Sequence, residues 1–349
     1  MARPKAVRAT LSDVALTAGT SIPTVSKVLR GGTDVSRSTR ERVMKAVALT
    51  GYQRSTSSRD QPGEGAADSR AGLIDLILVD LHGSWAIRAL SGVEQAAARL
   101  GLGVIVTMAR PDDDWLTILL RRKSEGAIVH VFQQSWEGLR TLQAAGVPVV
   151  LMDPMSDPPD DIPSVSAASW NGGRLAAEHL LDLGHIGIAA IGGMRRDLYS
   201  EARLDGFRSA MVRRGVEVDQ SRFVYGRWSR DEAARLSYEM LTGPNPPTAF
   251  FACNEAMAFG VYDSVARLGL RVPQDISVVG FDDLPEALWV NPPLTTVQQP
   301  IAEMGAAAVR MLVELRAEPS GAPNRPARHE EHATSLVERS STAPPPITG

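Results

Sequence analysis

The sequence predicts an α/β protein in which a small helical head precedes two doubly wound α/β subdomains. From Leu73 onward, short apolar runs rich in β-branched residues alternate with helical patterns, which predicts parallel sheets covered by helices. The first 60 residues instead contain only helical patterns and are strongly basic. Between the two regions, residues 53–70 lack large apolar side chains and are rich in Ser, Gly and Pro, which is typical of a linker.

The charge distribution separates the head from the body. Residues 1–60 carry 11 Lys and Arg against 4 Asp and Glu, a net charge of +7. The whole chain of 349 residues has a formal net charge of −3, so the other 289 residues carry −10. Because a uniformly basic chain would bind phosphate everywhere, a basic head on an acidic body indicates that only the head meets a polyanion. Nucleic acid is therefore the expected partner.

The head contains three short helical patterns. Thr10, with an acid three residues later, has the form of a capping box and opens the first helix. Ser21 can cap a second helix over residues 22–29, in which Pro23 in the first turn loses no hydrogen bond. A third helix is expected over residues 38–50. Two short helices joined by a tight turn and braced by a third predict a helix-turn-helix for the major groove of DNA; a helical bundle with a basic, soluble surface is the alternative.

The body is expected to contain strands and helices in alternation. The strands are expected over residues 73–79, 104–108, 127–131, 147–152, 186–191, 248–252 and 276–281, and the helices over 86–100, 112–122, 135–145, 171–183, 201–214, 230–242 and 255–268. Two such sets, each longer than one hundred residues, predict two doubly wound subdomains.

Composition argues against membrane-spanning and exported proteins. The longest apolar runs, such as Leu76–Val79 and Val147–Met152, are far shorter than the roughly 20 residues of a membrane helix. The basic N-terminus is not followed by the apolar segment of a signal peptide. The single cysteine, Cys253, allows no internal disulfide, which fits a reducing cytoplasm. We therefore expect a cytoplasmic protein that does not associate with membranes.

A series of motifs runs in order from residue 10 to about residue 340. It includes Thr10-Leu-Ser-Asp-Val-Ala15, Thr24-Val-Ser-Lys-Val-Leu29, Leu180-Leu-Asp-Leu-Gly-His185, Arg203-Leu-Asp-Gly-Phe207, Asp275-Ile-Ser-Val-Val-Gly-Phe-Asp-Asp283 and Pro292-Pro-Leu-Thr-Thr-Val-Gln-Gln-Pro300. This series resembles the LacI/GalR family of bacterial transcription regulators. The resemblance implies a three-helix helix-turn-helix head on a two-subdomain, doubly wound body like that of periplasmic binding proteins.

The resemblance also implies domain boundaries. We expect a DNA-binding head over residues 1–58, a hinge or linker over 59–72, a ligand-sensing and dimerisation domain over 73–340 and a disordered tail over 341–349. Within the body, the N-subdomain is expected over about 73–168 plus 299–328, and the C-subdomain over about 169–298 plus 329–340.

The resemblance places base reading on Ile22, Pro23 and Lys27 in the second helix. Lys27 can donate to guanine O6 and N7, whereas Ile22 and Pro23 offer apolar contact, for example to a thymine methyl. Further contacts, mainly to phosphates that position the protein, are expected from Thr10, Ser21, Thr24, Ser26, Arg30, Arg37, Arg40 and Arg42. For the arginines of the third helix, a solvated surface face is an equally good interpretation.

The linker departs from the family pattern. Many members follow the Gly-Tyr pair with Pro-Asn and then a Leu, forming a hinge helix that inserts the Leu into the minor groove. Here Arg54-Ser55 and Gln61 occupy those positions, so the inserting side chain is missing. We expect Arg54 and Arg59 to act as phosphate or minor-groove cations instead.

The body lacks the sequence motifs of a catalyst. It has no phosphate-binding Gly-x-x-x-x-Gly-Lys-Ser/Thr loop, no complete dinucleotide loop and no Gly-x-Ser-x-Gly elbow, so no cofactor is expected. His329-Glu-Glu-His332 lacks the spacing of a zinc protease, and we expect an exposed charged loop there rather than a metal site. Asp282 and Asp283 follow an apolar strand, where open α/β sheets bind ligands. A glycosidase needs carboxylates on opposite sides of a bond, so sugar binding fits this pair better.

Seven residues are expected to bind the ligand. They are Asn171, Arg203, Asn254 and Asp282, whose positions the resemblance supplies, and Trp85, Trp170 and Trp289, which are added because an indole can stack on a pyranose. Carboxylate, amide and guanidinium groups pair with the vicinal hydroxyls of a sugar. Each tryptophan could equally be a packed core or interface residue, and Asn254 could simply cap a helix.

Together these expectations describe a repressor in the bacterial cytoplasm, associated with the nucleoid. A homodimer would bind a palindromic double-stranded operator, and a sugar or oligosaccharide between the body subdomains would control its affinity. Relief of repression by the sugar is the first expectation, and a co-repressor mode is the alternative. The competing functions are a non-enzymatic sugar-binding protein of the periplasmic type and, more distantly, a glycosidase acting through Asp282 and Asp283.

Overall fold

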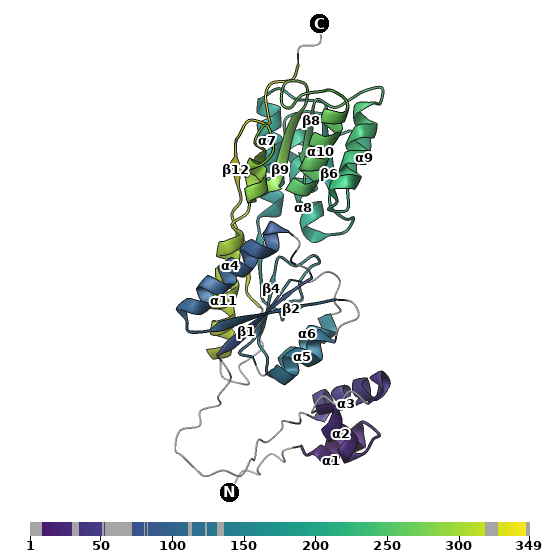
Figure 1. Ribbon diagram of the computed structural model, residues 1–349, viewed down its shortest axis with the longest axis vertical. Helices are drawn as coiled ribbons and strands as arrows, with labels where there is room; N and C mark the ends of the chain where they lie inside the picture. Colours follow the sequence, from purple (N-terminus) through teal and green to yellow (C-terminus); the bar gives the residue numbers. More distant parts are fainter. Residues whose placement is uncertain are drawn as a thin grey trace.

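The computed structural model describes residues 9–29, 35–50, 52, 72–79, 81, 83–110, 114–122, 124–130, 136–317 and 327–346. They form a three-helix head and two α/β subdomains that follow one another along the long axis of the molecule (Figure 1). The predicted fold class is therefore confirmed. The predictions for Arg54, Arg59 and Gln61 lie outside the described residues.

The head is built from α1 (Leu11–Thr17), α2 (Ile22–Leu29) and α3 (Arg37–Thr50). The predicted capping box is present, because the Asp13 N–H donates to Thr10 Oγ1 at 3.4 Å and the Thr10 N–H donates to the Asp13 carboxylate at 2.7 Å. The Thr24 N–H donates to Ser21 Oγ at 3.3 Å, so Ser21 caps α2 as expected. The three helices enclose a core of Val14, Ala15, Ala18, Val25, Val28, Val43 and Ala46. This packing sets the angle at which α2 presents its exposed face.

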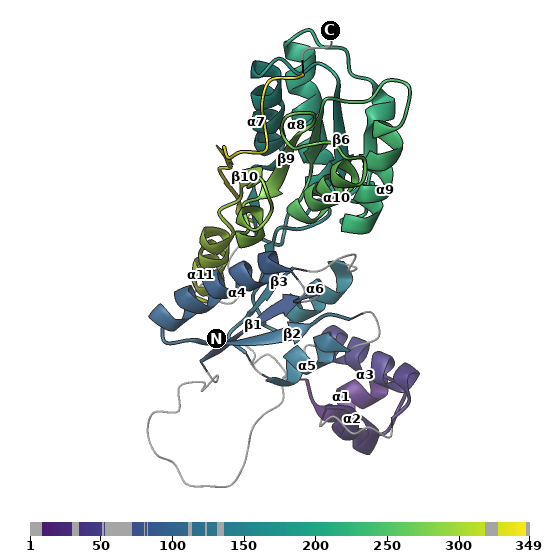
Figure 2. The ribbon, with the colours of Figure 1, turned by 45° about the horizontal axis from the view of Figure 1, so that its top comes forward.

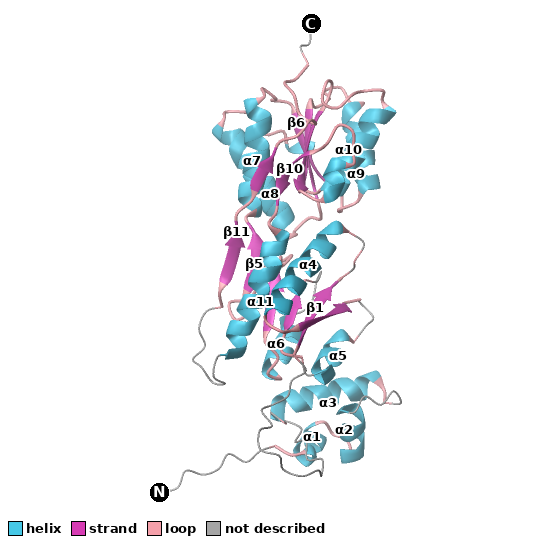
Figure 3. Cartoon of the chain, turned by 60° about the vertical axis from the view of Figure 1, so that its left-hand side comes forward, coloured by secondary structure: helices cyan, strands magenta, loops and turns pink. Residues whose placement is uncertain are grey.

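The first body sheet has the strand order β11-β5-β4-β3-β1-β2, and every neighbouring pair in it is parallel. Its strands are β1 (Leu73–Leu78), β2 (Gly103–Met108), β3 (Ala127–Val129), β4 (Val149–Met152), β5 (Ser164–Ala167) and β11 (His329–His332). Helices α4 (Ser84–Arg99) and α11 (Ile301–Ala317) cover one face, and α5 (Trp115–Arg122) and α6 (Trp136–Ala144) cover the other (Figures 2 and 3).

The second body sheet has the order β12-β10-β9-β8-β6-β7, with only β12 antiparallel among the described strands. Its strands are β6 (Ile188–Gly192), β7 (Phe223–Tyr225), β8 (Ala249–Ala252), β9 (Ser277–Asp282), β10 (Thr295–Gln298) and β12 (Ser335–Val337). Its helices are α7 (Ser169–Asp182), α8 (Leu198–Arg213), α9 (Arg230–Leu241) and α10 (Glu255–Arg267), with the 3₁₀ turns η1 (Gln220–Arg222) and η2 (Pro285–Leu288).

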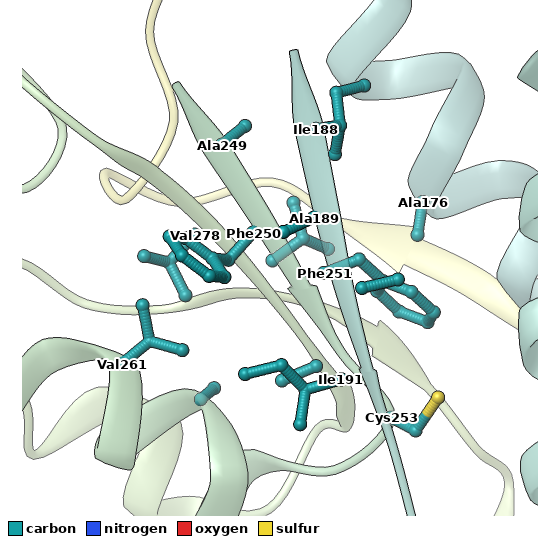
Figure 4. Packing of buried hydrophobic residues seen from close by; sticks show 14 of the residues in the cluster. Ala176, Ile188, Ala189, Ile191, Ala249, Phe250, Phe251, Cys253, Val261 and Val278 are labelled. Atoms are coloured by element: carbon teal, nitrogen blue, oxygen red, sulfur yellow. The ribbon is translucent and has the colours of Figure 1, made fainter. Parts of the chain in front are cut away.

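Adjacent phenylalanines in β8 show how both faces of this sheet are buried. Phe250 points toward Val261 of α10, whereas Phe251 points to the opposite face, toward Ala176 of α7 (Figure 4). The Phe251 ring stacks on Phe207 of α8 with centroids 4.9 Å apart. Because successive strand residues point to opposite faces, a continuous apolar run requires cover on both sides, as the sequence predicted.

The chain passes between the subdomains at three places, around Ala168, around Gln299 and between β11 and β12. The prediction that residues 329–332 form a charged loop in the C-subdomain is wrong, because they form β11 in the first sheet. Pairing with β5 accounts for this: His329 Nδ1 lies 2.9 Å from Ser164 Oγ, and the Ala168 N–H donates to the His332 carbonyl at 2.8 Å. No group of three possible metal ligands occurs among the described residues.

The predicted disordered tail is wrong for its first residues. Ser341 is buried, and its hydroxyl accepts from the Thr295 N–H at 2.7 Å and donates to the Val278 carbonyl at 2.6 Å. The Ala343 N–H donates to Ser277 Oγ at 3.0 Å. These bonds hold the segment against the end of the second sheet, which sequence composition alone does not indicate. No helix among the described residues has the length and apolarity needed to cross a membrane.

The close packing of α7 on α8 leads to a first prediction. A Cβ on Gly173 would lie 1.8 Å from the Arg203 carbonyl oxygen, so Gly173→Ala forces the helices apart. We expect the free energy of unfolding to fall by about 1–3 kcal/mol, as for other overpacked sites. The matched control is Gly138→Ala in α6, where the added Cβ meets only the Leu116 side-chain end at 2.8 Å. Thermal denaturation of both variants checks this, and equal stability of the two would contradict it.

Candidate functional site

A cavity of about 240 Å³ lies between the two subdomains. The first subdomain lines it with Val79, Gly83, Trp85, Ala86, His130 and Asp153, and the second with Tyr199, Arg203, Trp228, Asn254 and Asp282. Gln299, where the chain crosses between the subdomains, completes the lining. These residues follow or begin near the carboxyl ends of parallel strands in both sheets. That edge is where open α/β sheets bind ligands.

Arg203 is the buried cation of this cavity. It lies on α8 and is 2% exposed, and its Nη1 donates to the Cys253 carbonyl. The same nitrogen lies 3.6 Å from Asp282 Oδ1, and the Cζ atom lies 3.8 Å from the centroid of the Phe281 ring. A carbonyl, a carboxylate and a ring face thus fix the guanidinium plane, which leaves a charged donor at the cavity wall.

Two buried carboxyl groups approach Arg203 from opposite subdomains. Asp282 ends β9 with φ 111° and Asp153 follows β4 with φ 50°, both in the left-handed region that favours glycine. Burial raises the pKa of Asp282 to about 6, although Arg203 and a hydrogen bond from Gln299 oppose the shift. Burial likewise raises the pKa of Asp153, against the opposing charges of Arg203 and His130. Strained backbone at two such residues is typical of a functional site.

Aromatic rings form two walls of the cavity. In the first subdomain, Trp85 lies on His130 with ring centroids 4.3 Å apart. In the second, Tyr199 lies beside Trp228 with centroids 5.4 Å apart. Apolar ring faces combined with a few buried polar groups are typical of a small-molecule site.

Three polar contacts cross the cleft beside the cavity. Ser84 Oγ of α4 donates to the Glu286 carboxylate of η2, and Arg88 Nη1 donates to the Asp283 carbonyl at 2.9 Å. On the other side, the Leu198 N–H donates to the Met155 carbonyl at 2.7 Å. These contacts depend on the relative position of the subdomains, so they report directly on cleft closure.

The second candidate site is a groove of about 480 Å³ between α2 and α3 of the head. It is lined by Thr20, Pro23, Thr24, Lys27, Val35, Ser36, Thr39 and Arg42. Ile22 is 45% exposed although it is apolar, and Lys27 is also exposed. An exposed apolar residue and a cation on the second helix of a helix-turn-helix fit contact with base edges.

Comparisons with known proteins find relatives of both the head and the body. Residues 10–55 match the model of bacterial regulatory proteins of the lacI family, and residues 177–342 match that of the periplasmic binding protein-like domain. The HTH-type transcriptional regulator MalR of Streptomyces coelicolor is 33% identical, over 96% of this chain and 97% of its own. The chain belongs to the LacI family.

Solved structures of LacI-family regulators share the fold over nearly the whole chain. The transcriptional regulator CelR in complex with cellobiose has a TM-score of 0.72 at 28% identity, covering 96% of this chain and 100% of its own. The lac repressor dimer bound to operator and the anti-inducer ONPF has a TM-score of 0.67 at 28% identity, covering 97% and 100%. This LacI-family protein is thus a DNA-binding transcription regulator and not an enzyme.

The structure brings four of the seven expected ligand residues of this LacI-family regulator to the cavity: Trp85, Arg203, Asn254 and Asp282. Asn254 also caps α10, since its side-chain oxygen accepts from the Met257 N–H at 2.9 Å. Asn254 therefore fits both interpretations that the sequence left open: it caps α10, and it lines the cavity. Both are possible because it follows the carboxyl end of β8, which faces the cleft.

The other three expected ligand residues lie outside the cavity lining. Trp170 is 39% exposed on α7 with Arg213 above its ring, and Asn171 accepts from Arg174 at 2.8 Å on the same helix. Trp289 is 74% exposed at the end of η2. Asp283 also turns away from the cavity and pairs with Arg339 at 2.5 Å, so the two adjacent carboxylates serve different partners.

Sequence reasoning missed several lining residues of this LacI-family body. Asp153 follows the apolar strand β4, so the rule that found Asp282 would also have found it. His130 follows β3 in the same way. Gln299 follows β10, whose sequence Thr-Thr-Val-Gln is not an apolar run, so the same rule does not reach it. Tyr199 and Trp228 come from a helix start and a loop, and no local pattern marks them.

The predicted DNA contacts are distributed over the head. Pro23, Thr24 and Lys27 line the groove, and Ser21 is exposed beside it. Thr10 caps α1, and Ser26 and Arg40 are half-buried. Arg42 lines the groove, whereas Arg40 is not among the lining residues. Arg30 and the side chain of Arg37 lie outside the described residues.

A buried acid behind the cavity gives a pH prediction. Glu255 accepts hydrogen bonds from the Leu284 N–H at 3.0 Å and from Thr296 Oγ1 at 3.2 Å. Burial, with a further contribution from Asp282, raises the pKa of Glu255 to about 9 from its usual 4.5. Between these values the folded protein binds the proton that the unfolded chain has lost, so stability contributed by this group falls as pH rises.

We therefore expect the free energy of unfolding of the wild type to fall, relative to Glu255→Gln, as pH rises from about 4.5 to about 9. Gln copies the neutral acid and does not titrate. Urea denaturation of both proteins across this range measures the difference. Parallel pH profiles would show that Glu255 titrates normally in the folded protein.

Proposed function

We propose that this regulator is a repressor whose affinity for its operator is controlled by a sugar bound between the body subdomains. The observation that carries this is the chemistry of the cavity: two aromatic walls surround a buried arginine and two carboxyl groups supplied by opposite subdomains. Arg203, Asp282 and Asn254 offer donors and acceptors to vicinal hydroxyls, and Trp85 offers an indole face to the C–H face of a pyranose.

The size of the cavity supports a small sugar. Its volume of about 240 Å³ is near the lower end of small-molecule sites, which span roughly 300–1,000 Å³. Two related regulator structures support the same ligand class, since one contains cellobiose and another, from Enterococcus faecium, contains ribose at 25% identity and a TM-score of 0.70. We therefore favour a mono- or disaccharide.

We propose a homodimer that binds a palindromic operator. The lac repressor structure at TM-score 0.67 is a dimer on operator DNA. Two-fold protein symmetry requires near two-fold operator symmetry, which sets two half-sites. Ile22, Pro23 and Lys27 would read bases, and Thr24, Ser21 and Arg42 would contact the backbone. The protein would thus work at the bacterial nucleoid in the cytoplasm.

We propose the domain organisation with two revisions, one at residues 329–332 and one at residues 341–346, which pack against the second sheet. Residues 1–58 form the DNA-binding unit and 59–72 the hinge. The N-subdomain then comprises residues 73–168 plus 299–332, because β11 belongs to the first sheet, and the C-subdomain comprises 169–298 plus 333–346.

The mechanism is thermodynamic linkage between cleft and head. A ligand that contacts both subdomains favours the closed cleft, and it changes DNA affinity only by its differential affinity for the two states. The contacts of Ser84 with Glu286 and of Leu198 with Met155 join the two subdomains across the cleft, so they depend on the relative orientation of the subdomains. A sugar that stabilises these contacts therefore holds the two subdomains in one relative orientation.

The test is operator binding by fluorescence anisotropy. Operators are selected from random DNA, and binding is measured with and without ribose, glucose, maltose and cellobiose. We expect a palindromic site to be released by one of these sugars. Tighter binding with sugar would establish the co-repressor mode instead, and the absence of any sugar effect would overturn the proposed ligand class.

A matched pair of tryptophan variants sharpens this test. Trp85→Ala removes a cavity wall and is expected to weaken sugar binding at least about tenfold, whereas Trp289→Ala removes an indole outside the cavity and leaves sugar affinity unchanged. Isothermal titration on the free protein measures both. Equal losses in the two variants would show that the sugar binds elsewhere.

The head yields a second prediction. Lys27→Ala should reduce the preference for operator over scrambled DNA, because a base contact contributes about 1–3 kcal/mol of discrimination. Arg42→Ala should weaken binding to both DNAs alike. It should also lower the slope of log K against log salt concentration by about one. Anisotropy titrations at several salt concentrations distinguish the two effects. Loss of specificity in the Arg42 variant with retention in the Lys27 variant would reverse the assignment.

A further inference from the structure

Trp228 reaches the cavity on a strained piece of backbone. Arg227 and Trp228 have φ values of 54° and 59°, so two consecutive residues that are not glycine adopt left-handed conformations. The Arg227 N–H donates to the Gly193 carbonyl at 3.0 Å, and the Gly226 N–H donates to the Gly192 carbonyl at 2.8 Å. These bonds bend the chain back over the end of β6. Strain of this kind persists only where surrounding contacts hold it.

The absence of a side chain at Gly193 makes room for the indole. A Cβ on Gly193 would lie 1.9 Å from Trp228 Cε2, so the ring lies directly against the peptide backbone there. On its other sides the ring meets Tyr199 and approaches Arg203, whose Cζ lies 5.9 Å from the indole. Packing on these sides therefore holds the plane of the ring.

A hydrogen bond holds the polar edge of the indole. Trp228 Nε1 donates to Asp197 Oδ2 at 2.9 Å, and Asp197 is only 8% exposed. Burial raises the pKa of Asp197, and the bond from Trp228 opposes the shift. Asp197 occupies the N-cap position of α8, yet within this described helix its side chain caps no backbone N–H. Its carboxyl group is therefore directed to the indole rather than to the helix.

Asp197 also adjoins a contact that crosses the cleft. The next residue, Leu198, donates its N–H to the Met155 carbonyl of the other subdomain at 2.7 Å. Tyr199, which lies beside the Trp228 ring, follows immediately. One short segment thus holds the indole, a cavity wall and the cross-cleft bond. The indole is therefore in direct contact with the start of α8.

We propose that Asp197 is a positioning residue, which orients the Trp228 indole against the ligand and links that orientation to the cross-cleft bond of Leu198. The inference rests on the proposed function in that the ligand is taken to be a sugar. Asp197 does not line the cavity, so it acts on the ligand through Trp228. Asp197 thereby controls how tightly the sugar binds and how strongly binding closes the cleft.

The first test uses the free protein and needs no ligand. The indole N–H resonances of the six tryptophans are recorded by ¹H–¹⁵N correlation, with Trp228→Phe assigning that of Trp228. We expect Asp197→Ala to shift the Trp228 resonance and to speed its exchange with water at least about tenfold, because the bond is lost. Asp197→Asn retains an acceptor oxygen and should restore slow exchange. An unchanged Trp228 resonance in Asp197→Ala would overturn the proposal.

The second test measures binding of ribose and cellobiose to the full-length variants. Asp197→Ala should bind the active sugar at least about tenfold more weakly, or about 1.4 kcal/mol, with Asp197→Asn within about threefold of wild type. In the Trp228→Phe background, where no indole N–H remains, Asp197→Ala should cause little further loss. Additive losses of the two substitutions would show that Asp197 acts independently of Trp228 and would overturn the proposal.

The two tests separate this inference from the proposed function. If the wild type binds none of ribose, glucose, maltose and cellobiose, the proposed ligand class fails, while the resonance experiment still decides whether Asp197 holds Trp228. If the wild type binds sugar and Asp197→Ala binds it equally well, the function stands and the positioning role fails.

Discussion

The buried guanidinium of Arg203 is the interaction on which the cavity depends. A charge without solvent is costly unless it is paired and hydrogen-bonded, and the structure supplies the Cys253 carbonyl, the Asp282 carboxylate and the Phe281 ring. Meeting these partners requires α8 to lie close to α7, which Gly173 permits. Pairing the Arg203 guanidinium therefore constrains where β8 and β9 end. It also constrains how closely α7 and α8 pack.

The same arrangement explains how a small ligand can control a distant head. The carboxyl ends of both parallel sheets face one another across the cavity, so a ligand that contacts Arg203 and Asp153 contacts both subdomains. Among the described residues, polar contacts across the cleft come from short segments at Ser84, Arg88 and Leu198. A modest binding energy can then shift the balance between subdomain orientations, which is all that linkage requires.

Local patterns in the sequence succeeded where a feature depends on neighbouring residues. The capping box at Thr10, the cap at Ser21 and the alternation of strands and helices were all predicted and are present. The strand-end rule located Asp282, and it would have located Asp153 had it been applied to every apolar strand. The three tryptophans were predicted because an indole can stack on a pyranose, and only Trp85 of the three lies at the cavity. Residue type does not say which way a side chain faces.

The sequence by itself determined the three-helix head, the basic charge of that head, the two doubly wound subdomains and the polar residues at strand ends. Only the tertiary structure decided that residues 329–332 join the first sheet, that Ser341 is buried and that Trp228 rather than Trp289 forms a wall. The physical reason is the distance along the sequence between the residues that interact. Caps and hydrophobic periodicity are set within one or two turns of chain, whereas edge pairing and cavity walls depend on contacts between segments far apart in sequence, such as β11 with β5 or Asp197 with Trp228.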